Sequence, residues 1–321
     1  MNFQELKTVG NADFYLDIAI KRTKKKMTEL REGSLRGSSL QRSKFIELSK
    51  LESIETEING QLMKVLKSFP SLDNLSEFYK ELIDVTLDMV YIKKSLGSLK
   101  WCTEKNREFM RLYKSKIKMA TEIDRINQYR KEFYGRIAST LKQINKHLEY
   151  LEHSRRTMLD YPSIKTSLTT IAITGFPNVG KSTLLSKLTT AKPKIASYAF
   201  TTQGVNIGYS EINGEKIQFL DTPGTLNRFE RQNVVEKIAS LAIKYVAEAL
   251  VYVFDLTEAS APLEDQIELY YVLKKARKPV IVYLSKTDVA DKKDVDKFIE
   301  KYDAVANIEE LKDKLKEIKI M

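Results

Sequence analysis

The stretch GFPNVGKS at residues 175–182 decides how the second half of this chain folds. It matches the pattern G-x-x-x-x-G-K-[ST], follows the apolar run LTTIAIT at residues 168–174, and precedes a segment with helical spacing. In such a strand–turn–helix unit, successive backbone N–H groups and the helix N-terminus face negative charge. The sequence therefore predicts a phosphate-binding loop. A chance match is the alternative, and the flanking strand and helix argue against it.

Each residue of this loop has an expected role. Gly175 and Gly180 let the backbone wrap around phosphates, Lys181 neutralises the β- and γ-phosphates during binding and catalysis, and the Ser182 hydroxyl holds Mg2+. The residues expected to contact the nucleotide here are Asn178, Val179, Gly180, Lys181, Ser182 and Thr183.

Two further segments fit a triphosphate site. Asp221-Thr-Pro-Gly follows the apolar run KIQFL, so its carboxylate should lie at the end of a strand and hold Mg2+, and the Gly224 N–H can reach the γ-phosphate. Between the two motifs lies Ala-Phe-Thr-Thr at residues 199–202, where we favour Thr202 to complete the Mg2+ shell, with Thr201 as the alternative. Lys181, Thr202 and Gly224 are thus the expected catalytic residues.

The organisation of the chain changes near residue 160. Short apolar runs alternate with helix-length segments in residues 161–321, which is typical of a mostly parallel sheet with helices on both faces. Residues 1–160 contain few Gly or Pro and repeat apolar residues at spacings of three and four, which predicts a helical bundle. The expected fold is a basic helical domain followed by an α/β phosphate-loop domain.

The positive charge belongs to the first half. Residues 1–165 hold 32 Lys+Arg and 22 Asp+Glu, a net +10 of the total +11. In a predicted helix from about residue 82 to 121, basic residues recur every seven positions with others on the adjoining turn, and residues 21–26 hold a second cluster. We favour a polyanion-binding surface over an ordinary solvated helix face. The helix stripe comprises Lys93, Lys100, Arg107, Lys114, Arg111 and Lys118.

Composition excludes several other classes of protein. The single cysteine, Cys102, cannot form an internal disulfide and has no metal-ligand spacing around it. The longest apolar runs fall well short of the ~20 residues that span a bilayer, and the N-terminus lacks a signal-peptide pattern. A cytoplasmic protein without membrane insertion is expected.

The switch segments resemble those of the Obg group of translation-factor-class GTPases, in which F-T-T and D-x-P-G occur together. Since ATPases share the phosphate loop, base choice depends on Ser285-Lys-Thr-Asp288, which resembles the guanine-reading N-K-x-D segment. There Asp288 would accept from N1–H and the exocyclic amine of guanine, and the Lys286 stem would pack on the base. Ser285 replaces the usual Asn, so an amide that reaches the base and braces the phosphate loop is lost. Ala304 is the candidate contact for the guanine carbonyl.

Two positions bear on hydrolysis. Thr225 stands where Ras-like enzymes have the glutamine that orients water, so water must be positioned in another way. Asn178 occupies the position that, in GTPases with GxPNVGKS loops, coordinates a potassium ion in place of an arginine finger. Potassium-stimulated hydrolysis is one hypothesis, and a purely loop-shaping role for Asn178 is the other.

Segments in the first half of the chain make the family resemblance more specific. SFPSLDNL at residues 68–75, then FYKELIDV and KKSLGSLKW, are similar to the N-terminal domain of the nucleolar GTP-binding protein 1 family, and DLTEASAPLEDQ in the second half agrees. The resemblance covers nearly the whole chain. It implies a role in assembly of the large ribosomal subunit, with ribosomal RNA, ribosomal proteins and the subunit precursor as partners and GTP/GDP and Mg2+ as cofactors. The short C-terminus resembles an archaeal form.

Three functions remain open on this reading. The favoured one is a GTP-hydrolysing switch that binds a preribosomal particle in one nucleotide state. A second is a nucleotide-gated scaffold with little hydrolysis, and a third makes the basic helices a membrane-surface or protein-binding module.

Overall fold

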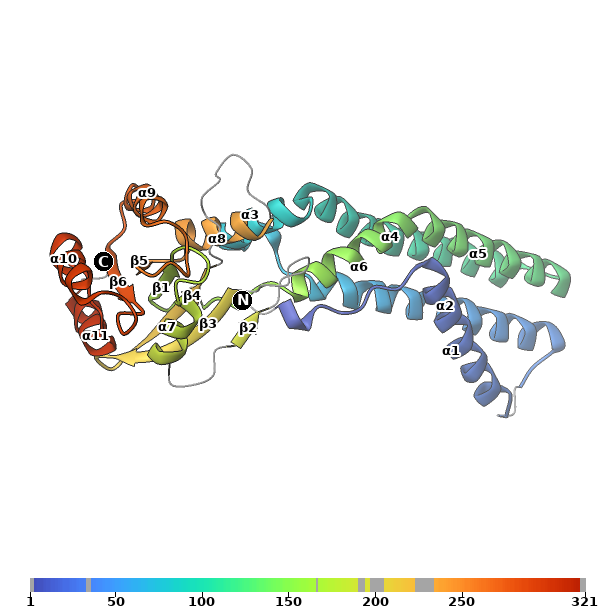
Figure 1. The fold of residues 1–321 in the computed structure, drawn as a ribbon. Helices are drawn as coiled ribbons and strands as arrows, with labels where there is room; N and C mark the ends of the chain where they lie inside the picture. The colour runs from blue at the N-terminus through green and yellow to red at the C-terminus, as the bar shows by residue number, and fades with distance from the viewer. Residues whose placement is uncertain are drawn as a thin grey trace. The chain divides into compact units, whose positions relative to one another are not determined.

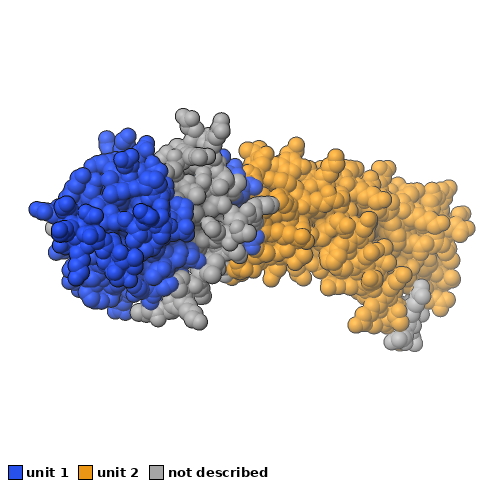
Figure 2. Space-filling model, viewed as in Figure 1, with its two compact units in different colours: residues 1–2, 75–86, 160–321 blue, residues 3–74, 87–159 orange. Residues whose placement is uncertain are grey.

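The computed structural model describes residues 3–32, 36–165, 167–189, 194–196, 205–222 and 234–317. The chain divides into two compact units (Figure 2). The helical unit comprises Phe3–Asn74 and Leu87–Leu159, and the sheet unit comprises the described residues of Leu75–Thr86 and Asp160–Met321.

The helical unit is built from long helices that bury one apolar stripe each. Within it, α2 packs against α1, α4 and α5, and α4 also packs against α5 and α6 (Figure 1). On α2, Leu51, Ile58 and Leu62 are fully buried at helical spacing, as the sequence pattern predicts. Its elements are η1 (Phe3–Glu5), α1 (Ala12–Glu32), α2 (Ser39–Ser68), η2 (Leu72–Asn74), α4 (Met89–Met119), α5 (Ile123–Gln143) and α6 (Asn145–Leu159).

The single helix predicted from about residue 82 to 121 is wrong. The structure has α3 (Glu77–Thr86) and then α4, which begins at Met89. Asp88 caps α4, because its Oδ1 accepts a hydrogen bond from the Tyr91 N–H at 2.8 Å. An aspartate inside an apolar helical pattern was the available signal for this break.

The sheet unit takes in α3, which the sequence places within the helical domain of residues 1–160. The Tyr79 hydroxyl of α3 donates to the Pro162 carbonyl at 2.8 Å, and α3 packs against α8 (Val234–Tyr245). The Glu81 carboxylate of α3 accepts from the Tyr245 hydroxyl of α8 at 3.1 Å. The two compact units therefore differ from the two predicted domains in one helix, α3, which belongs to the sheet unit.

The described strands form a six-stranded sheet in the order β2-β3-β4-β1-β5-β6. The pairs β4–β1, β1–β5 and β5–β6 are parallel, whereas β2–β3 and β3–β4 are antiparallel. The predicted mostly parallel fold is confirmed. The strands are β1 (Thr170–Thr174), β2 (Lys194–Ala196), β3 (Val205–Ile212), β4 (Glu215–Asp221), β5 (Ala249–Asp255) and β6 (Val280–Ser285).

The strand order reverses direction at β1, and this reversal positions the site. After β1 the chain crosses to β2 at one edge of the sheet and returns through β3 to β4 beside β1. It then continues to β5 and β6 on the other side of β1. Right-handed crossovers then put the helix that follows β1 on one face of the sheet and the helices that lead into β5 and β6 on the other, which opens a crevice at the carboxyl end of β1. The other helices of the sheet unit are α7 (Lys181–Leu188), α9 (Leu263–Lys274), α10 (Lys292–Tyr302) and α11 (Ile308–Glu317), shown in Figure 1.

The core of this unit surrounds β1 and β5, both of which are buried along their whole length. Tyr252 and Phe254 of β5 lie edge to face against each other, with ring centroids 4.7 Å apart. Among the residues that the structure describes, no helix is both long and apolar enough to cross a bilayer.

Candidate nucleotide-binding site

The phosphate loop connects β1 directly to α7. Gly175 has φ of 142°, and a Cβ atom there would lie 2.6 Å from the Val253 carbonyl oxygen of β5, so only glycine fits. Gly180 has φ of 94° and forms the N-terminal cap of α7. Asn178 also adopts a left-handed conformation, with φ of 65°, which asparagine tolerates better than most residues. The backbone is thus already bent around the place where phosphates are expected.

Lys181 is held inside this loop. Its side chain is buried, and Nζ donates to the Phe176 carbonyl at 2.6 Å. Burial lowers the pKa of Lys181 to about 8, although the nearby Asp221 carboxylate acts in the opposite direction. Among the described residues the only hydrogen-bond acceptor of Lys181 Nζ is the neutral Phe176 carbonyl, so the desolvated cation is well prepared to bind an anion. The phosphate-binding role predicted for Lys181 is consistent with this placement.

Ser182 and Asp221 meet across the loop. The Ser182 hydroxyl donates to Asp221 Oδ2 at 2.5 Å, and the Asn206 side-chain amide donates to the same oxygen at 3.0 Å. Asp221 ends β4, where it lies opposite Ile173 of β1 and Asn206 of β3. A hydroxyl and a carboxylate in contact are hard oxygen ligands of the kind Mg2+ prefers, so these residues fit the predicted metal.

Asn206 was missed by the sequence reasoning. It belongs to no phosphate-binding motif, and only the antiparallel register of β3 and β4 brings it beside Asp221. The remaining loop residues divide by exposure: Val179 is fully buried, whereas the Asn178 and Thr183 side chains are exposed. The predicted residues Thr202 and Gly224, with Thr201 and Thr225, lie outside the described residues.

Ser285 braces the phosphate loop, contrary to the expected loss of that brace. Its hydroxyl lies 2.6 Å from the Val179 carbonyl oxygen and 2.9 Å from the Phe254 carbonyl oxygen. A hydroxyl has one proton, so the two carbonyl oxygens share it. Because Val179 belongs to the loop and Phe254 to β5, Ser285 joins the end of β6 to both. The side chain retains the bracing contact that was expected to disappear with the asparagine amide.

Lys286 is fixed by an ion pair at the ends of β5 and β6. Its Nζ lies 2.6 Å from Asp255 Oδ2, and the Asp255 side chain is fully buried. Burial acts to raise the pKa of Asp255, but hydrogen bonds from Lys286 and Thr257 outweigh it and the net pKa is lowered. Gln266 of α9 closes the arrangement, since it accepts from the Asp255 N–H at 3.0 Å and donates to the Asp255 carbonyl at 2.8 Å. Asp255 and Gln266 are the first and last residues of DLTEASAPLEDQ, to which the sequence assigned no individual role.

Asp288 is exposed, in the turn that follows β6. Within the described part of the chain, no residue forms a hydrogen bond or an ion pair with its carboxylate. It is therefore open to accept hydrogen bonds from a base, as the N-K-x-D resemblance requires.

Ala304 is a correction to the sequence-based assignment. Its side chain is buried in the core, and its N–H already donates to the Ile299 carbonyl at 3.2 Å, so it is not available to a guanine carbonyl. Val305 forms a parallel bridge with Tyr283 of β6. Because parallel strands end at the same edge, the residue after the bridge, Ala306, lies closer to the expected base than Ala304 does.

Comparisons with known proteins match each half of the chain to a known family. Residues 3–165 match the NOG1 N-terminal helical domain, and residues 170–286 match the 50S ribosome-binding GTPase family. An uncharacterised protein of Methanocaldococcus jannaschii is 37% identical over 91% of this chain and 83% of its own length. Nucleolar GTP-binding protein 1 of Drosophila melanogaster is 29% identical over 92% of this chain, and that of Arabidopsis thaliana 27% over 90%.

The chain spans 45% and 43% of the Drosophila and Arabidopsis proteins, respectively. The two family matches cover both compact units in chain order, and the archaeal relative is similar over most of both lengths. The chain therefore belongs to the nucleolar GTP-binding protein 1 family, and its sheet unit carries a GTPase domain.

Proposed function

We propose that this protein is a GTP-hydrolysing switch that acts in assembly of the large ribosomal subunit and binds ribosomal RNA or preribosomal particles through its helical unit. The proposal rests on the placement of Lys181, Ser182 and Asp221 together at the carboxyl end of β1. It also rests on the membership of the chain in this family. Preribosomal particles, ribosomal RNA and ribosomal proteins are the proposed partners.

At the phosphate end, the residues of the chain divide the work. Lys181 binds and neutralises the β- and γ-phosphate oxygens, and the bent loop offers its backbone N–H groups to them. Ser182 and Asp221 would hold Mg2+, which supplies further positive charge to the transferred phosphate. We assign γ-phosphate sensing to Gly224 and completion of the metal shell to Thr202.

Asn178 supports a potassium requirement. Its left-handed backbone and exposed side chain leave its amide oxygen available to a cation, and no other described residue holds that amide. We expect faster single-turnover hydrolysis in KCl than in NaCl at equal ionic strength, and loss of the difference in Asn178→Ala. Equal rates in the two salts would leave Asn178 with a loop-shaping role only.

The helical unit offers a basic face on α4. Lys93 pairs with Asp73 and Lys114 with Glu52, so part of the predicted stripe is neutralised. Lys100, Arg107 and Arg111 are exposed, and no ion pair to another described residue involves them. Together with Lys118, which is also exposed and has no ion pair with a described residue, these three cations are the part of the stripe that can neutralise RNA phosphates. Binding through them should weaken steeply with salt.

The experiment that tests this function is cosedimentation with large ribosomal subunits, with GDP or a non-hydrolysable GTP analogue bound. We expect nucleotide-dependent sedimentation that is lost when Lys100, Arg107 and Arg111 are all changed to Gln. The matched control changes Lys292, Lys297 and Lys301 of α10 to Gln, which removes the same charge from exposed positions of the sheet unit. No sedimentation at physiological salt in either nucleotide state would contradict the proposal.

The location of the protein remains a prediction. The eukaryotic relatives carry the word nucleolar in their names, whereas the sequence predicts a cytoplasmic protein.

A further inference from the structure

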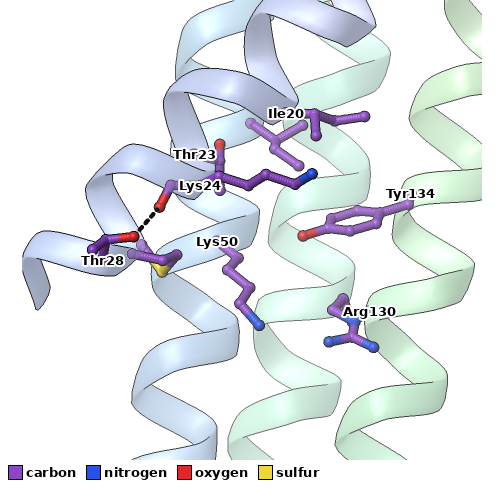
Figure 3. Close-up of a pocket in the computed structure, with 9 residues that line it drawn as sticks. Ile20, Thr23, Lys24, Thr28, Lys50, Arg130 and Tyr134 are labelled. Carbon is purple, nitrogen blue, oxygen red and sulfur yellow. Dashed lines mark hydrogen bonds between the residues drawn. The ribbon is translucent and has the colours of Figure 1, made fainter. Parts of the chain in front are cut away.

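A pocket of about 480 Å3 lies within the helical unit, and all of its lining residues precede the GTPase motifs in the sequence. It opens between α1, α2 and α5, and its volume falls in the range of small-molecule sites. Its lining combines apolar side chains with cations and hydroxyl groups, and Figure 3 draws these residues as sticks. The lining residues are Ile20, Thr23, Lys24, Met27, Thr28, Lys50, Ile54, Arg130 and Tyr134.

Two of the cations, Lys50 and Arg130, are held in place by the same carboxylate. Glu47 is buried and is not a lining residue, and its Oε1 accepts from Lys50 Nζ at 2.6 Å and from Arg130 at 3.3 Å. The pair of contacts fixes both cations in place and uses only part of their hydrogen-bonding capacity, since an ammonium has three donors and a guanidinium five. The lining therefore presents positive charge that is positioned in advance.

The third cation and a hydroxyl face each other across the pocket. Figure 3 shows the Lys24 ammonium from α1 and the Tyr134 hydroxyl from α5 pointing toward one another from opposite walls. No other described residue pairs with the Lys24 ammonium or forms a hydrogen bond with the Tyr134 hydroxyl. Burial of the ring, with a smaller effect of Glu47, raises the pKa of Tyr134 to about 12. The hydroxyl thus keeps its proton and can donate.

The apolar part of the lining suits a planar ring. Met27 and Ile54 are buried, and Ile20 is 41% exposed at the mouth, where a bound ring would cover it. Aliphatic side chains and the Tyr134 ring can stabilise a nucleobase through burial and stacking, and every base has a face that can stack.

We propose that the pocket between α1, α2 and α5 binds one nucleoside monophosphate unit, with its phosphate against Lys24, Lys50 and Arg130 and its base against Ile20, Ile54 and Tyr134. The unit can be a free nucleotide or one nucleotide of a single-stranded RNA. In the second case the inference rests on the proposed RNA-binding function and assigns it a definite site.

The test uses the full chain loaded with GDP and Mg2+, so that the phosphate loop is filled. Two probes are titrated by fluorescence anisotropy and competition: a fluorescein-labelled oligouridylate and unlabelled UMP. The variants are Lys24→Gln and Tyr134→Leu, which leave the Glu47 contacts intact. Lys131→Gln is the matched control, because it removes the same charge from an exposed position of α5, next to Arg130, that does not line the pocket. Thermal unfolding of each variant checks that the helical unit is intact.

We expect Lys24→Gln and Tyr134→Leu each to weaken probe binding about tenfold, and Lys131→Gln by less than about twofold. Displacement of the oligomer by UMP assigns the site to a free nucleotide, and binding of the oligomer alone assigns it to RNA. If the oligomer binds but Lys24→Gln and Lys131→Gln weaken it equally, the pocket is overturned while RNA binding stands. If neither probe binds, the pocket is also overturned, and the ribosome sedimentation experiment decides the RNA-binding function separately.

Discussion

The two ends of the nucleotide site are built differently. At the phosphate end, Lys181 and Asp221 are buried and their polar atoms already have partners in the loop and on neighbouring strands. At the base end, Asp288 is exposed and Ala304 is turned into the core. Ser285 connects the two ends through its contact with Val179.

This difference shows that one contiguous stretch of sequence can build the phosphate end of the site but not the base end. The phosphate loop is a strand, a turn and a helix in direct succession, so its geometry follows from local backbone requirements such as those of Gly175 and Gly180. The base end is assembled from β6, the turn after it and the segment near Val305, which the sheet brings together. The phosphate end should therefore dominate affinity, and the base end should mainly set selectivity.

The largest effect is expected at Lys181. Replacement of Lys181 by Met removes the buried cation, and the loss of charge-assisted hydrogen bonds should weaken GDP binding about 100-fold. The measurement is titration with a fluorescent GDP analogue, with Lys187→Met on the exposed face of α7 as the control. A loss of less than threefold would mean that the phosphate end does not dominate affinity.

The next effect tests base selectivity at Asp288. Inosine lacks the exocyclic amine of guanine, so GDP should bind about tenfold better than IDP if Asp288 accepts from that amine. Asp288→Ala should bring the ratio close to one, whereas Asp296→Ala, on α10, should leave it unchanged. If both variants keep the preference, guanine is read by other residues.

A pH effect should follow from the lowered pKa of Lys181. In the free protein this pKa is about 8, and bound phosphates raise it, so the proton uptake on binding grows as the pH rises through 8. The protonated fraction falls as pH rises, and GDP affinity should drop about eightfold between pH 7.5 and pH 9.

Lys181→Arg is the control for this pH series, because arginine stays charged over the range and titration of the guanine base is common to both proteins. Isothermal titration in buffers of different ionisation enthalpy measures the proton uptake directly. Parallel pH profiles for the two proteins would show that Lys181 does not titrate in this window.

The smallest effect concerns the connection between the two ends. Ser285→Ala removes one hydroxyl donor to Val179, which is worth about 1 kcal/mol, or about fivefold in GDP affinity. Ser98→Ala removes a comparable hydroxyl-to-carbonyl bond in the helical unit and should leave affinity unchanged. An unchanged GDP affinity in Ser285→Ala would mean that this contact does not couple the base end of the site to the phosphate end.

The sequence alone was sufficient for much of the fold. The change from helical to strand periodicity near residue 160, the phosphate loop and the position of Asp221 at a strand end all follow from local patterns, and the structure confirms the fold class. The break at Asp88 was hidden because the apolar spacing continues across it. Sequence patterns of helices do not show which unit a short helix such as α3 joins.

What the amino-acid sequence by itself determined is the chemistry of the phosphate end, because a loop that is continuous in the chain carries its own geometry. What only the tertiary structure decided depends on residues distant in the chain. Asn206 reaches Asp221 through strand register, Ser285 reaches Val179 through the order of β1, β5 and β6, and Lys24 faces Tyr134 through helix packing. The physical reason is that side-chain periodicity states which face of an element is buried, but not which element covers it.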